Sequence, residues 1–183
     1  MRKKTFVAAL VLTLCSVSAF ADIVPERRPL QIVNDITSQV RQYSRFTIFD
    51  DVNVRMENGV AVLTGAVTMG FKREDIARLV GTVPGVTSVT NQLTILPTSP
   101  FDDELRHRIA RAIYGNANFW NYAAMPNPPI HIVVVNGHVT LTGVVQNNVD
   151  RMLARSLATN FGAFDVKNEL KTDAEMKALL EKI

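Results

Sequence analysis

Cysteine is nearly absent from this 183-residue sequence: the one present, Cys15, lies within residues 1–21. That segment has a basic start at 2–4, an apolar run at 5–17 and a small-residue cleavage site ending at Ala21, which is typical of a secretory signal peptide. Cleavage after Ala21 leaves a chain without a thiol. Disulfides, thiolate metal sites and cysteine nucleophiles are then excluded.

The sequence also has no second long apolar run and no excess of one charge once the signal is removed. Spanning a bilayer takes about 20 apolar residues, so no transmembrane segment is expected in the mature protein. Cleavage removes three of the 20 basic residues and none of the 17 acidic ones, which leaves 17 of each. Near-neutral charge and export both disfavour nucleic acid as a partner. We expect a soluble periplasmic protein.

Signatures of catalysis are missing too: the sequence has no Gly-x-Ser-x-Gly, phosphate-binding loop or dinucleotide fingerprint. Among its three histidines, His131 and His138 come closest to a metal pair. In the hairpin predicted below, however, His131 faces Thr142 rather than His138. The acidic pairs at 50–51 and 102–103 are predicted to be turn or cap residues. We expect no catalytic residue, no metal and no cofactor.

An internal repeat organises the rest of the chain. Residues 58–67, which include Asn-Gly and Leu-Thr-Gly, recur as residues 136–145. A second motif, Val-x-Asn-x-Leu, occurs at 89–93 and again at 166–170. Two matches in the same order indicate a tandem of two similar units.

Each unit has the pattern of an αββαβ fold. Apolar residues at helical spacing precede an Asn-Gly hairpin, and a second helix and an alternating strand follow. A helical crossover places the third strand parallel to the second. The fold class is therefore α+β, with a mixed three-stranded sheet covered on one face by two helices. The expected elements are helices at 32–43, 73–80, 105–113 and 149–160, hairpins at 52–67 and 130–145, and strands at 89–95 and 164–170.

These patterns also set the domain boundaries. Within the first unit, residues 72–75 are expected to be a solvated helix start because their charges are mixed. A capping box at Thr172 and Glu175 predicts a last helix, for which packing on the second unit is favoured over binding a partner. The predicted segments are 1–21 (signal peptide), 22–29 (amino-terminal tail), 30–96 (first unit), 97–100 (proline-containing linker), 101–171 (second unit) and 172–183 (carboxy-terminal helix).

Two αββαβ units with a Leu-Thr-Gly hairpin and a Val-x-Asn-x-Leu strand resemble tandem BON domains. A signal peptide followed by two such domains resembles the OsmY-like periplasmic proteins. The resemblance implies non-enzymatic binding to phospholipid membranes, with a role in envelope integrity or osmotic stress. The second unit departs from the pattern in a longer connection before its hairpin.

Basic and aromatic residues gather at the start of the second unit, a combination suited to anionic lipid headgroups and the hydrocarbon boundary. The alternative for Phe119 and Trp120 is that they fill the core of this unit. A second functional hypothesis is a soluble protein-interaction or chaperone-like stress protein with envelope protein partners. The residues proposed for lipid binding are Arg106, Arg108, Arg111, Phe119, Trp120 and Tyr122.

Overall fold

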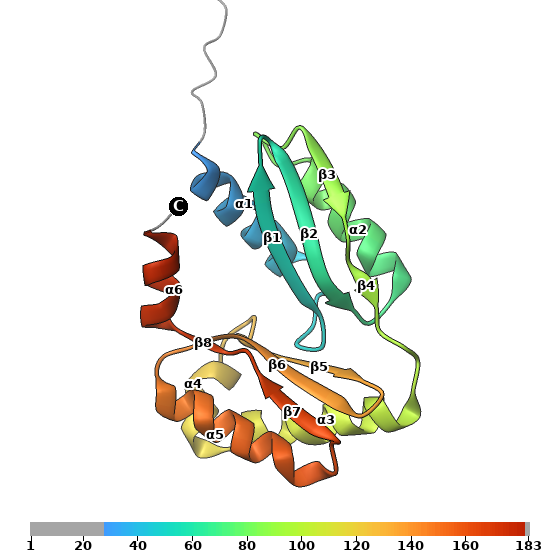
Figure 1. Ribbon diagram of the computed structural model, residues 1–183, viewed down its shortest axis with the longest axis vertical. Coiled ribbons are helices and arrows are strands. Elements are labelled where there is room, and N and C mark those ends of the chain that lie inside the picture. Colours follow the sequence, from blue (N-terminus) through green and yellow to red (C-terminus); the bar gives the residue numbers. More distant parts are fainter. Residues whose placement is uncertain (1–27, 182–183) are drawn as a thin grey trace, which may run out of the picture.

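The first unit folds in the order expected from its sequence (Figure 1). The structure is a computed structural model that describes residues 28–181, so the predicted signal peptide, residues 22–27 of the predicted tail and residues 182–183 of the predicted last helix lie outside the described part. Proline opens the first helix, where its missing N–H leaves no bond unmade. The elements are α1 (Pro29–Gln42), β1 (Asp51–Glu57), β2 (Val60–Val67), α2 (Gly70–Gly81), β3 (Ser88–Asn91) and β4 (Thr94–Ile95).

The second unit repeats this order with an insertion. Its first helix begins at Pro100, the last residue of the predicted linker, and Ser99 caps it by accepting a 3.2 Å hydrogen bond from the Asp102 N–H. The insertion, η1 and α4, fills the longer connection before the hairpin and was not predicted. The elements are α3 (Pro100–Tyr114), η1 (Ala117–Phe119), α4 (Trp120–Ala123), β5 (Ile130–Val135), β6 (His138–Val145), α5 (Asn148–Ala158), η2 (Thr159–Phe161), β7 (Asp165–Asn168), β8 (Lys171–Thr172) and α6 (Asp173–Leu180).

Both sheets have the predicted mixed topology. β1 pairs antiparallel with β2, and β3 pairs parallel with β2; β5, β6 and β7 repeat this arrangement. The two Asn-Gly turns have positive φ at both residues, 49° and 83° in the first unit and 51° and 80° in the second. This is the conformation that a two-residue hairpin requires. The predicted αββαβ fold is therefore confirmed in both units.

The third strand of each unit is broken into two short pieces around the repeated asparagine. The Asn91 side chain donates to the Arg73 carbonyl of α2 and accepts from the Leu93 N–H, at 2.9 and 3.1 Å. In the second unit, Asn168 makes the same two contacts with Arg151 and Leu170. The Val-x-Asn-x-Leu motif therefore ties the end of the sheet to the crossover helix.

The glycine of Leu-Thr-Gly is required by close packing of the hairpin strands. Gly143 has a φ of 113°, and a Cβ added there would lie 1.8 Å from the Pro129 carbonyl oxygen. Gly65 has a φ of 115°, and a Cβ added there would lie 2.3 Å from the Asp51 carbonyl oxygen. No other residue fits such a position without moving the neighbouring strand.

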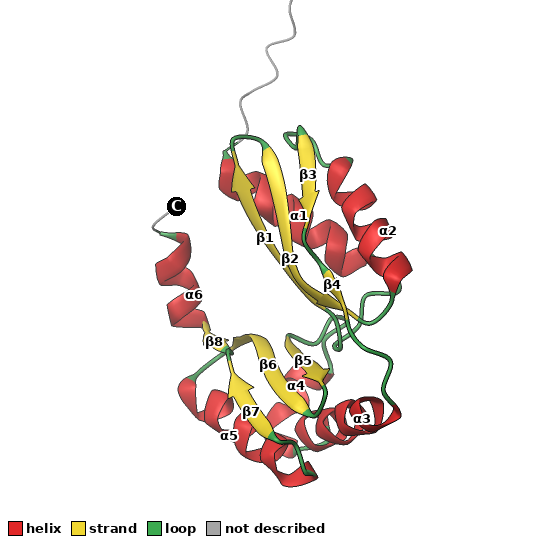
Figure 2. Cartoon of the chain, turned by 45° about the vertical axis from the view of Figure 1, so that its right-hand side comes forward, coloured by secondary structure: helices red, strands yellow, loops and turns green. Residues whose placement is uncertain are grey.

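Helices cover one face of each sheet, and a separate apolar core lies beneath each helix pair (Figure 2). In the first unit, Ile36 of α1 and Ile76 of α2 meet Leu63 of β2, all fully buried. In the second unit, Ile109 of α3 corresponds to Ile36 and Leu141 of β6 corresponds to Leu63, and both are fully buried. The cores thus follow the predicted apolar stripes.

The last helix, α6, packs less closely than the sequence suggested. Its capping box forms as predicted, because Thr172 and Glu175 exchange side-chain and main-chain hydrogen bonds of 2.8 and 3.3 Å. None of its residues is buried, and Leu179 and Leu180 are exposed. The helix is held at its base by an ion pair from Arg151 of α5 to Glu175, at 2.9 Å.

Candidate functional site

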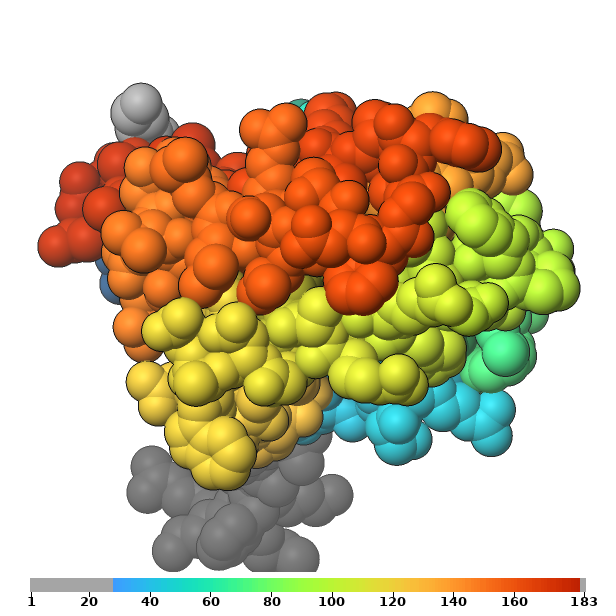
Figure 3. Space-filling model, turned by 90° about the horizontal axis from the view of Figure 1, so that it is seen from below, coloured from blue at the N-terminus to red at the C-terminus, as the bar shows by residue number. Residues whose placement is uncertain are grey.

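The helical layer of the second unit forms one continuous face of the protein. α3, η1 and α4 lie beside α5 on this face (Figure 3). We call this surface the helical face and define it by the exposed side chains of those four elements.

The six residues proposed for lipid binding divide between this face and the interior. Trp120 is 72% exposed, and Arg108 and Arg111 are also exposed. Arg106, Phe119 and Tyr122 are buried. The alternative that the aromatic pair fills the core therefore holds for Phe119 and fails for Trp120.

Arg106 is turned inward and fastens α3 to the hairpin. Its guanidinium donates to the Val134 carbonyl at 2.6 Å and forms an ion pair with Asp103. A buried guanidinium needs such partners, because an unpaired buried charge is strongly destabilising. Arg106 therefore supports the helical face without contributing to its surface.

Tyr122 locks α4 against the start of α5. Its hydroxyl donates to the Asp150 carboxylate at 2.6 Å and accepts from the Gln146 N–H at 2.8 Å. Burial, helped by the hydrogen bond to Asp150, raises the pKa of Tyr122 to about 12. With Phe119 in the core 5.7 Å away, this anchor leaves Trp120 pointing to solvent.

The helical face has further exposed apolar side chains that sequence reasoning missed. Val149 and Met152 of α5 are 74% and 66% exposed. With Arg155 they are spaced three residues apart, and so they follow one side of the helix. The helical spacing of the sequence could have revealed them, because these residues lie on a different side of α5 from the buried Ala154 and Ala158.

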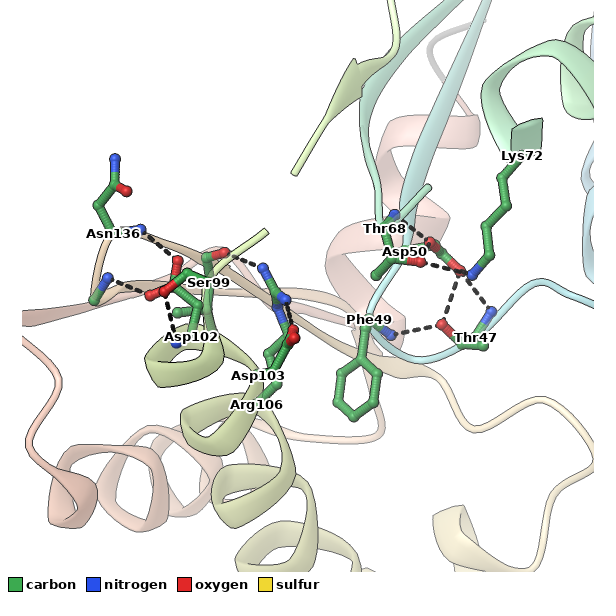
Figure 4. A network of polar contacts seen from close by, with 12 residues as sticks. Thr47, Phe49, Asp50, Thr68, Lys72, Ser99, Asp102, Asp103, Arg106 and Asn136 are labelled. Carbon is green, nitrogen blue, oxygen red and sulfur yellow. Dashed lines mark hydrogen bonds and ion pairs between the residues drawn. The ribbon is translucent and has the colours of Figure 1, made fainter. Parts of the chain in front are cut away.

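A buried ion pair organises the loop that leads into β1. Asp50 accepts hydrogen bonds from Thr47 and Thr68 and forms an ion pair with Lys72 at 2.6 Å (Figure 4). Burial alone would raise the pKa of Asp50, but the bonds from Lys72, Thr68 and Thr47 together hold it below its usual value. The prediction that residues 72–75 are a solvated helix start is wrong for Lys72, which is 5% exposed.

Asp102 is also buried, and its role differs from the predicted cap. Its two carboxylate oxygens accept from the Asn136 and Gly137 N–H groups, each at 2.8 Å. Figure 4 shows the side chain reaching from α3 to the hairpin turn. Ser99 caps the helix instead, so Asp102 fixes the turn to α3.

The two units contact each other through the loop that Asp50 organises. The Ile132 N–H of β5 donates to the Ile48 carbonyl at 2.8 Å, and the Thr142 hydroxyl donates to Asp51 at 2.9 Å. β5 is an edge strand of its sheet, so the first unit covers part of an edge that would otherwise be open.

Aromatic rings add to this interface. Phe49 packs edge-on against His107 of α3, with ring centroids 5.0 Å apart, and Phe46 lies 5.4 Å from His131. The Nδ1 atom of His131 is buried and has no hydrogen-bond partner in the described part of the chain. Burial lowers the pKa of His131, although the Asp51 carboxylate acts in the opposite direction.

Residues 28–181 contain no group of three or more His, Cys, Asp or Glu side chains that could hold a metal ion. No helix in this range is long and apolar enough to cross a membrane.

Two αββαβ units in tandem, each with its own core, define a duplicated α+β protein with an exposed aromatic and basic face. The family model described as BON domain matches residues 31–97 and again residues 102–174. The chain belongs to the BON-domain family.

Other comparisons add little to this assignment. No curated protein matches the sequence. One similar solved structure is CdsD, a structural protein of the type III secretion system of Chlamydia trachomatis, at 16% identity and a TM-score of 0.28, covering 82% of this chain and 97% of that one. A second, the CdsD carboxy-terminal domain, has 16% identity and a TM-score of 0.30, covering 79% of this chain and 98% of that one.

Proposed function

We propose that this chain is a non-enzymatic periplasmic protein that associates peripherally with anionic phospholipid membranes through its helical face, in support of envelope integrity or the osmotic stress response. The observation that carries the proposal is the 72% exposure of Trp120 on a helical face that also has exposed arginines. Tryptophan buries a large ring at the hydrocarbon boundary while its N–H stays hydrated, which suits an interfacial contact.

The apolar part of the contact extends beyond Trp120. Val149 and Met152 of α5 are exposed on the same layer of helices, and neither contributes to the buried core. Leaving such side chains in water gains nothing for folding, whereas inserting them at a membrane surface removes apolar area from water.

The basic part consists of Arg111 and Arg155, with Arg108 beside them. Arg108 forms a 2.5 Å ion pair with Glu104, but both side chains are exposed, so the pair is weak and lipid phosphates can compete with it. Each arginine held near an anionic surface contributes about 1 kcal/mol. Basic residues would attract the protein, and the apolar side chains would then insert.

Vesicle binding tests the proposal, and Trp120 is a convenient reporter because it is the only tryptophan of the chain. We expect its emission to shift to shorter wavelength with vesicles that contain phosphatidylglycerol and not with neutral phosphatidylcholine vesicles. Replacing Arg111 and Arg155 with Ala should weaken binding by roughly 30-fold, the equivalent of about 2 kcal/mol. Trp120→Ala, followed by co-sedimentation, should weaken it as well.

The control is a double change of the same chemistry in the first unit, Arg55→Ala with Arg73→Ala, which removes two exposed arginines outside the helical face. This variant should retain most of the binding. Equal partition onto neutral and anionic vesicles, or equal losses in the two double variants, would refute a contact through the helical face.

A further inference from the structure

A cleft of about 620 Å³ lies between the two units. Its walls come from α1 and the first half of β1 in the first unit, from β5 and β6 in the second, and from Met176 of α6. The volume is within the range of ligand pockets, roughly 300 to 1,000 Å³. The helical face does not contribute to it.

The cleft runs along the open edge of β1. Four consecutive residues of this strand, 51–54, line it. Side chains of a strand alternate between its two faces, so a cleft on one face would contact every second residue. Contact with all four indicates that the main chain of β1 faces the cleft, and β1 is indeed an outer strand of its sheet.

The repeat shows which main-chain groups point into the cleft. Val54 lies opposite Leu63 in the first unit, as Ile132 lies opposite Leu141 in the second. The Ile132 N–H points out of its sheet, since it donates to the Ile48 carbonyl. By the same register, the Val54 N–H and carbonyl point out of β1, and in the described residues no main-chain group outside the sheet bonds to them.

A strand added beside β1 would be covered on both faces. On one side, Val33 and Thr37 of α1 are half-buried and lie along the cleft beyond the edge of the sheet. On the other side, Thr142 and Val144 of β6 present the outer face of the second sheet. Small and branched side chains on both walls leave room for an extended chain.

Two exposed cations at the cleft, Arg41 and Lys171, favour acidic side chains on an occupant. Neither forms an ion pair within residues 28–181. The two carboxylates present, Asp51 and Glu169, are already engaged. Their partners are Thr142 and Asn53 for Asp51, at 2.9 and 2.8 Å, and Lys167 for Glu169, at 2.5 Å.

We propose that the cleft between the units binds an extended acidic peptide segment of a partner protein, which adds to the edge of β1 as a further strand. Main-chain hydrogen bonds to Val54 supply affinity, as in other cases of strand addition. Arg41 and Lys171 favour carboxylates on the peptide. The proposal is independent of the lipid contact, which involves a different surface.

Nuclear magnetic resonance titration tests this directly on the full-length mature chain. The probes are capped peptides of roughly eight residues, in which Val or Ile alternates with Glu, Ser or Lys. We expect the Glu peptides to bind saturably and to slow hydrogen exchange of the Val54 amide. N-methylation of alternate peptide amides should weaken binding about tenfold or more, because it removes the main-chain donors.

Matched variants locate the site. Thr37→Tyr should block the cleft, whereas Asn34→Tyr, on an exposed side of the same helix, should not. Arg41→Glu with Lys171→Glu should abolish the preference for Glu over Lys peptides, whereas Arg73→Glu on α2 should leave it unchanged. Circular dichroism of each variant checks that the fold is retained.

Three outcomes would overturn the proposal. The first is no saturable binding by any peptide up to about 1 mM. The second is binding that N-methylation or Thr37→Tyr does not affect. The third is displacement of the peptide by lauric acid, together with insensitivity to N-methylation, which would identify the cleft as a site for a single-chain amphiphile instead.

Discussion

Removing the buried carboxylate of Asp50 should destabilise the first unit more than removing its cationic partner. Asp50 accepts five hydrogen bonds, two from Thr47, two from Thr68 and one from Lys72. Asp50→Leu leaves the ammonium of Lys72 buried and frees the donors of both threonines. Breaking a buried ion pair from one side costs about 3 to 5 kcal/mol, a large part of the roughly 5 to 15 kcal/mol that stabilises a domain.

Lys72→Met should cost less, because the carboxylate keeps four of its five donors. The double variant, Asp50→Leu with Lys72→Met, should be more stable than Asp50→Leu alone, since no buried charge is then left unpaired. The measurement is equilibrium unfolding in urea followed by circular dichroism. The exposed pair Arg55 and Glu57, 2.8 Å apart, provides the control: Glu57→Leu should cost about 0 to 1 kcal/mol.

The pH dependence supplies an independent check. The pKa of Asp50 is lowered in the folded state, so its contribution is present above pH 3.8 and is lost as the pH falls below that value. Asp50→Asn should show less of this acid-dependent loss. The structural role assigned to the buried pair is wrong if Asp50→Leu costs no more than Glu57→Leu. It is also wrong if the stability lost in the double variant equals the sum of the losses in the two single variants.

Three further predictions follow from the packing of the second unit. Gly143→Ala should destabilise it by more than about 2 kcal/mol, because the new Cβ would overlap the Pro129 carbonyl. Gly162→Ala, where φ is 79° and nothing lies within 4 Å, should cost only about 1 kcal/mol, and urea unfolding compares the two variants. Tyr122→Phe should cost about 1 to 3 kcal/mol through the two lost hydrogen bonds, and similar stability to the parent would contradict the anchoring role. Because the pKa of His131 is lowered, stability should fall as the pH drops below 6.5 and level off below the folded-state value; His131→Gln should flatten this decline in pH-dependent thermal unfolding.

Periodicity in the sequence was sufficient for the fold, because the core positions are local and regularly spaced. Ile36 and Ile109 could be assigned to buried helix faces from the i, i+4 pattern alone, and the Asn-Gly turns defined both hairpins. The repeated asparagine at 91 and 168 was visible as a motif. Its bond to the carbonyl of a crossover helix could not be inferred, because it depends on how the strand and helix meet in space.

The candidate site was less predictable, because burial of a long side chain depends on tertiary contacts. Arg106 and Arg108 are two positions apart on α3, and only the structure shows that one points to the Val134 carbonyl and the other to solvent. Lys72 was misassigned for the same reason, since its partner Asp50 lies 22 residues earlier in the sequence. Trp120 and Phe119 are neighbours with opposite environments, which composition cannot distinguish.

The bond from Ile132 to the Ile48 carbonyl has a practical consequence for work on separate halves of the protein. A fragment that begins in the linker would expose the whole length of β5, and an uncovered outer strand favours self-association. Such a fragment could give sedimentation or binding data that reflect aggregates. Comparing point variants of the intact chain avoids that artefact.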